Sequence, residues 1–174
     1  AYCAPTYHPI AEGIAVEGMR LIFDNLPKAV ANGKDLEARA HMMSAAAMGA
    51  AAFQKGLGAI HALSHPVGAL YHTHHGTTNA VVMPMVLDHN RPAIEALIER
   101  AASYLGIRGG FDGFRARVME LRSELGIPAG LAAMGVEQAR LDELTDMALE
   151  DPTCGSNPVK MTRESMRALY QACM

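Results

Sequence analysis

The sequence is poor in the residues that mark several common protein classes. It has no tryptophan, and only 5% of its 174 residues are aromatic and 19% are charged. The three cysteines, Cys3, Cys154 and Cys173, are far apart and form no Cys-x-x-Cys pair. Such a small, odd number excludes a disulfide framework and predicts a reducing, cytoplasmic setting. The apolar runs are too short and too mixed to span a membrane.

The charge and the pattern of apolar residues exclude further classes of protein. The formal net charge is −3 and no basic stripe is present, so we expect no nucleic-acid partner. No export signal is found at the N-terminus of the sequence. No stretch alternates apolar and polar residues over a convincing length, and no repeat period is visible, so the sequence predicts an all-α fold.

The remaining composition is that of one globular domain. Half of the residues are hydrophobic, which suits a single domain over residues 1–174 with a sizeable core. Apolar spacing predicts a helix over 10–26 that ends or kinks at Pro27, and a turn over 32–35. The Ala- and Met-rich stretch 35–54 predicts a central helix, apolar on every side. Further helices are expected over 92–105, 111–125, 137–150 and 161–173, with a turn at 90–92.

Histidine is concentrated in one segment. Five of the eight histidines lie between positions 61 and 75. His61 and His65 are four residues apart, so on a helix both side chains leave the same face. Pro66 is expected to kink or stop that helix, and the apolar run 77–87 predicts the next one. His75 would then stand at a helix entrance, from which it could approach the first pair.

Spacing alone leaves two interpretations of these histidines open. They could hold a metal or act in catalysis, or they could be ordinary hydrogen-bonded histidines on an apolar helix, since two at i and i+4 without a zincin glutamate are weak evidence of metal. We expect His72 and His74 to lie at the surface or behind any ligands.

The same segment carries a resemblance to a known family. The run G-L-G-A-I-H-A-L-S-H-P-V-G-A, followed by H-H-G-T-T-N-A-V-V-M-P, resembles the signature of the iron-containing (group III) alcohol dehydrogenases. The resemblance implies that His61 and His75 are ligands of a catalytic divalent metal, Fe²⁺ or Zn²⁺, and that His65 is a catalytic residue beside the substrate. It also implies NAD or NADP as cofactor and a small alcohol or aldehyde as substrate.

Parts of the family pattern are missing. The family takes two further ligands from an Asp-x-x-x-His helix and binds its nucleotide on an N-terminal α/β domain, and neither is present here. We therefore expect the helical-bundle C-terminal domain of a longer enzyme, inactive alone and homodimeric when complete. In the loop 151–160, Asn157-Pro158 matches the family, but Val159 replaces an Arg, and neither Thr153 nor Cys154 receives a role.

Two other hypotheses remain. The chain could belong to a metal-independent enzyme similar to a maleylacetate reductase, which metal dependence of the complete protein would distinguish. It could also be a stand-alone helical interaction domain that uses an exposed Ala/Met surface. An upstream nucleotide loop with Asp-x-x-x-His would oppose that last reading.

Overall fold

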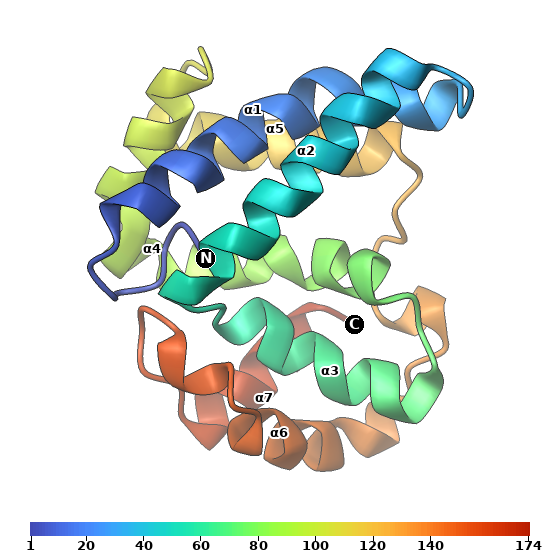
Figure 1. Ribbon diagram of the computed structural model, residues 1–174. Coiled ribbons are helices and arrows are strands. Elements are labelled where there is room, and N and C mark those ends of the chain that lie inside the picture. The colour runs from blue at the N-terminus through green and yellow to red at the C-terminus, as the bar shows by residue number, and fades with distance from the viewer. The chain divides into compact units, whose positions relative to one another are not determined.

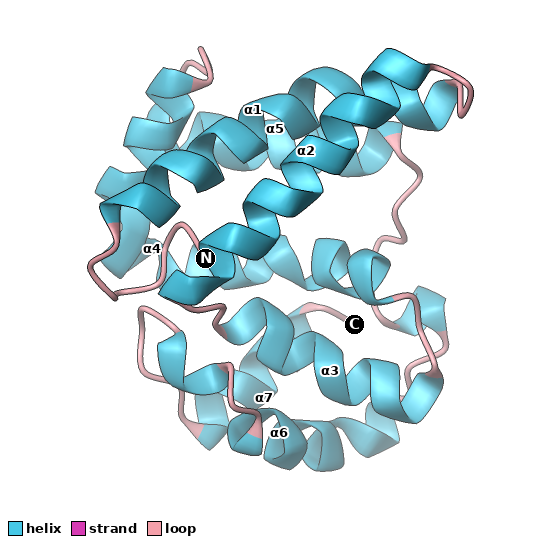
Figure 2. Ribbon diagram, viewed as in Figure 1, coloured by secondary structure: helices cyan, strands magenta, loops and turns pink.

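The computed structural model describes all 174 residues and consists of helices and loops, with no strand (Figure 2). The all-α prediction is therefore confirmed. The α-helices are α1 Pro9–Ala31, α2 Leu36–Ala52, α3 Ala59–Tyr71, α4 His75–Tyr104, α5 Gly110–Glu124, α6 Leu141–Glu150 and α7 Arg163–Ala172. Single 3-10 turns are η1 Phe53–Lys55, η2 Ala132–Met134, η3 Gln138–Arg140 and η4 Cys154–Ser156. None of the helices combines the length and apolar character that a membrane crossing requires.

The chain divides into two compact units. Unit 1 contains residues 1–56 and 95–125, and unit 2 contains residues 57–94 and 126–174. Helix α4 contributes its first part, up to Ile94, to unit 2 and the remainder to unit 1.

Unit 1 is built on the pairing of α1 with α2, which run side by side (Figure 1). A Cβ atom at Gly18 would lie 3.5 Å from the Met48 Cβ, so small residues allow this close approach. Helix α2 begins where the sequence predicted, because the Asp35 side chain caps it by accepting from the Ala38 N–H at 3.0 Å. Helix α5 packs on α1 through an edge-to-face contact of Phe23 with Phe114.

The prediction that 35–54 forms a central helix is wrong as to its position. Only Ala38, Ala45 and Ala52 of α2 are buried, whereas Leu36 and Met43 are 79% and 76% exposed. The buried alanines form one stripe along α2, and most of the other residues of this apolar helix are exposed or half-buried. Because apolar residues lie on every side of this helix, the sequence did not indicate which face would be buried.

Proline stops fewer helices than the sequence predicted. Pro27 lies inside α1 and Pro66 inside α3, so neither helix stops at its proline, whereas the kink that was the other expectation stays a prediction. Helix α4 continues through Pro92, so the predicted turn at 90–92 is wrong. A proline removes one intrahelical hydrogen bond but does not prevent the helix where tertiary packing holds it. Pro66 is itself buried, and Ile94, just after Pro92, is 1% exposed.

A buried lysine ties together the start of unit 1. Lys55, only 4% exposed, forms an ion pair of 3.0 Å with Glu12 and donates to the Tyr2 carbonyl at 2.8 Å. Arg100 from the end of α4 also pairs with Glu12. The segment before α1 contains no helix, and the contact between Lys55 and the Tyr2 carbonyl holds it in place.

Unit 2 contains a hydrophobic cluster to which α3 contributes. Helix α3 packs against α6, which packs in turn against α7. Leu63 and Val67 of α3 are fully buried. Other members of this cluster come from α4, α6, α7 and the loops: Val81, Val82, Val86, Leu131, Val136, Leu141, Leu144, Ala148, Met166, Leu169 and Tyr170.

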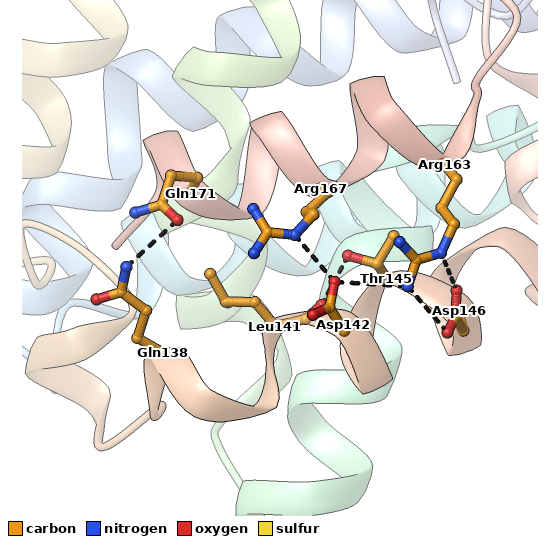
Figure 3. Close-up of polar contacts among 8 residues, drawn as sticks. All are labelled: Gln138, Leu141, Asp142, Thr145, Asp146, Arg163, Arg167 and Gln171. Carbon is orange, nitrogen blue, oxygen red and sulfur yellow. Dashed lines mark hydrogen bonds and ion pairs between the residues drawn. The ribbon is translucent and has the colours of Figure 1, made fainter.

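The outer faces of α6 and α7 carry solvent-exposed ion pairs. Arg167 donates to Asp142 at 2.9 Å and Arg163 to Asp146 at 2.7 Å, as Figure 3 shows. Thr162 caps α7 in a reciprocal capping box with Ser165.

Candidate functional site

The loop after α6 fixes the start of the histidine-bearing helix α3. Gly58 has a φ of 109°, which allows the chain to turn sharply into the helix. The next N–H, of Ala59, donates to the Asn157 side chain at 3.1 Å, and the Leu57 N–H donates to the Ser156 hydroxyl at 3.1 Å. These two side chains satisfy donors at the helix entrance that have no partner within the helix.

Asn157 also connects this loop to α4. Its amide pairs reciprocally with that of Asn90, at 2.9 Å and 2.8 Å, and both side chains are buried. The Asn157 side chain therefore links the start of α3 to α4 within unit 2.

Three histidine rings meet near the junction of α3 and α4. His61 and His65 project from successive turns of α3, as their spacing predicted, and His75 is the first residue of α4. Their ring centroids lie 5.6 Å apart for His61 and His65, 5.3 Å for His61 and His75, and 5.4 Å for His65 and His75. The chain turns back between the helices at His72, which adopts a left-handed conformation with a φ of 52°.

This spacing is suited to imidazoles that share one cation. A divalent cation bound to an imidazole nitrogen at about 2.1 Å lies roughly 3.2 Å from the ring centre, which puts two rings of a tetrahedral site about 5.3 Å apart. The observed separations agree with this value. The chain by itself holds no complete set of three or more His, Cys, Asp or Glu side chains arranged to bind a metal.

The local electrostatics also favour neutral imidazoles. Burial, together with the nearby His75 and His65, lowers the pKa of His61 to about 4. Burial and the neighbouring His65 and His74 lower the pKa of His75 as well. Both rings are therefore uncharged at neutral pH, and a neutral imidazole has the lone pair that a metal ligand needs.

Asn79 contacts the His75 ring one turn further along α4. Its amide nitrogen lies 3.0 Å from His75 Nε2, and its buried Oδ1 has no hydrogen-bond partner. The side chain of Asn79 therefore helps to orient the ring of His75.

Asp151 is the site residue that the sequence analysis missed. Its Oδ2 lies 2.8 Å from His65 Nδ1, and its side chain is 12% exposed. Burial raises the pKa of Asp151, but hydrogen bonds from Thr153 and His65 outweigh burial and the pKa is lowered overall. The two partners are 86 residues apart in sequence, so no local pattern indicated the pair.

The other residues considered from the sequence lie outside the triangle of rings. His72 and His74 are exposed, as expected. Thr153 acts through Asp151, to which its N–H and hydroxyl both donate. Burial raises the pKa of Cys154, which makes its thiol a poor nucleophile at neutral pH.

Known proteins resemble the chain along its whole length. It is 37% identical over 182 residues to 4-hydroxybutyrate dehydrogenase of Cupriavidus necator, covering 99% of the chain and 47% of the relative. It is also 37% identical over 166 residues to NAD-dependent methanol dehydrogenase of Bacillus methanolicus, covering 91% and 44%. A crystal structure of 1,3-propanediol oxidoreductase superposes with a TM-score of 0.94 at 31% identity, over 99% of the chain and 47% of that structure.

The chain thus spans about half the length of the curated relatives that it matches. The family model described as "Fe-containing alcohol dehydrogenase family, C-terminal" matches residues 1–174. The all-helical architecture and the two histidine-bearing helices agree with this match. The chain therefore belongs to the iron-containing alcohol dehydrogenase family as its C-terminal domain.

Proposed function

We propose that residues 1–174 act as one metal-binding domain of a longer, NAD(P)-linked alcohol dehydrogenase. In this reaction an alcohol carbon gives a hydride to the nicotinamide of NAD(P)⁺ and the hydroxyl loses a proton, which yields an aldehyde, NAD(P)H and H⁺. The observation that carries the proposal is the triangle of His61, His65 and His75, with ring centroids 5.3–5.6 Å apart.

His61 and His75 would hold the metal, Fe²⁺ or Zn²⁺. The lowered pKa values of both rings support this role, because protons do not compete for their nitrogens at neutral pH. When bound, the cation supplies Lewis-acid polarisation of the substrate oxygen. The remaining ligands and the NAD or NADP site would lie on parts of the protein outside this chain, so we expect the chain alone to be inactive.

His65 is suited to the proton transfer. Its side chain is 41% exposed, in contrast to the more buried His61, and it stacks on the His75 ring with an interplanar angle of 20°. A ring that is beside the metal ligands and also open to water could accept the hydroxyl proton and pass it to solvent. In this proposal His61 and His75 would hold the metal, and His65 would accept the hydroxyl proton.

Candidate substrates are small primary alcohols and the matching aldehydes. The relatives are named for 4-hydroxybutyrate, methanol and 1,3-propanediol, which makes these three compounds the first to test. No disulfide joins any of the three cysteines, which supports a reducing compartment such as the cytoplasm. We propose a homodimer for the complete protein.

The test uses the complete protein that carries this chain. We expect elemental analysis to find a divalent metal, and the three alcohols to reduce NAD⁺ or NADP⁺ in a metal-dependent way. Reduction that persists after chelation would favour the metal-independent, maleylacetate reductase-like alternative. Absence of any nicotinamide-linked activity with a full metal complement would refute the proposal.

A further inference from the structure

The carboxylate of Asp151 is held from both sides. Its Oδ1 accepts hydrogen bonds from the Thr153 N–H, at 2.8 Å, and from the Thr153 hydroxyl. Its Oδ2 faces His65 Nδ1 at 2.8 Å. Asp151 follows directly on the end of α6, so the rigid packing of α6 on α3 brings the carboxylate to the ring.

We propose that Asp151 is a positioning residue that holds His65 in the Nδ1–H tautomer, with the Nε2 lone pair directed at the reacting hydroxyl. An ionised carboxylate only accepts hydrogen bonds, so the contact at Nδ1 requires a proton there and leaves Nε2 without one. A proton acceptor needs that free lone pair. The inference rests on the proposed function of His65 and adds the group that sets its orientation.

The substitution Asp151→Asn is expected to invert the tautomer of His65. In Asp151→Asn, both Thr153 donors still require an acceptor, so they retain the amide oxygen on their side. The amide NH₂ must then face His65 Nδ1, which becomes the acceptor, and the ring proton moves to Nε2. Shape and hydrogen-bond count are conserved, while the lone pair at the reacting side is lost.

The experiment observes the ring directly. The complete protein is labelled with ¹⁵N-histidine, and the ring signals of the metal-free form are recorded at about pH 8, where neutral tautomers are distinguished. The signal that disappears in His65→Gln belongs to His65. We expect a protonated Nδ1 in the wild type and a protonated Nε2 in Asp151→Asn. The matched control is Asp146→Asn, which removes a carboxylate from the outer face of α6, paired with Arg163.

Kinetics of the metal-loaded protein give the second readout. We expect Asp151→Asn to lower kcat by about 10²-fold or more with KM changed less than about threefold and metal content unchanged, because the loss falls on proton transfer. Asp146→Asn should alter neither the tautomer nor kcat.

A wild-type His65 protonated at Nε2, or an unchanged tautomer in Asp151→Asn, would overturn the assignment, and the wild-type measurement does not need Asp151→Asn to fold. If the His65 tautomer inverts in Asp151→Asn while kcat stays unchanged, the role of Asp151 in the reaction is refuted. The tautomer is read without turnover, so a protein that oxidises no alcohol would refute the proposed function while this measurement still decides the role of Asp151.

Discussion

The hydroxyl of Tyr170 on α7 donates a 2.7 Å hydrogen bond to the backbone carbonyl of Leu63 on α3. Both residues are fully buried. Leu63 lies between His61 and His65 in sequence and faces the opposite side of the helix, toward the core. The Tyr170 hydroxyl therefore stabilises the histidine-bearing helix α3 on its core-facing side. Burial raises the pKa of this hydroxyl, so it stays protonated and remains a hydrogen-bond donor at physiological pH.

Tyr170→Phe should lower the free energy of unfolding by about 1 kcal/mol, since it deletes one buried hydrogen bond and keeps the ring in place. Urea unfolding followed by circular dichroism measures the change. Tyr7→Phe is the matched control because Tyr7 is 87% exposed, and it should have no effect. Equal stability of the two variants would contradict a supporting role for the Tyr170 hydroxyl.

Gly58→Ala should destabilise unit 2 by about 1–3 kcal/mol, because a Cβ is strained in this glycine-only region of backbone conformation. The backbone there has a φ of 109°, and the new methyl would lie 3.1 Å from the Asn157 Oδ1 that caps α3. Gly155→Ala, in the 3-10 turn η4 of the same unit, is the control, because no atom lies within 4 Å of its Cβ position. Similar melting temperatures for both variants would show that the turn tolerates a side chain.

Local sequence signals predicted most of the helices and the histidine cluster. The i, i+4 spacing of His61 and His65 placed them on one face, and the stretch 35–54 was predicted as a helix within one or two residues of α2. Such features depend on interactions within a few residues, which periodicity and capping rules capture.

The errors have one physical origin, which is packing between distant segments. Pro66 and Pro92 remain inside helices because buried neighbours offset the lost hydrogen bond. Asp151 reaches His65 only after α6 has docked on α3. Neither outcome has a local signal, so the carboxylate beside the ring could not be predicted from sequence.

Acid should destabilise the metal-free chain through His61. Its pKa is about 4 in the fold, against an ordinary value near 6.5, so the unfolded chain binds more protons between these limits. The contribution to stability is fully present above pH 6.5, falls as the pH drops toward 4, and changes no further below that. His61→Gln should flatten the dependence of melting temperature on pH across this window. An unaltered slope would show that His61 is not held neutral.

Loss of either proposed ligand should remove the metal from the complete protein. We expect His61→Ala and His75→Ala to reduce the metal content, measured by elemental analysis, to a few per cent of wild type or below, together with activity. His72→Asn is the control, because it changes an exposed histidine of the same segment to a residue that also tolerates a left-handed backbone. Full metal retention in either ligand variant would refute that assignment.

His65→Ala should separate metal binding from proton transfer. Its ring lies beside the His75 ring, but the proposed ligands do not include it, so the variant should keep its metal and lose about 10²–10⁴-fold in kcat. The dependence of the rate on pH should change, because the group proposed to accept the hydroxyl proton is gone. Exogenous imidazole should restore part of the rate, since the side chain that it replaces is 41% exposed and leaves an open space. A variant with wild-type kcat and an unaltered pH–rate profile would limit His65 to shaping the site, and loss of metal would make it a ligand.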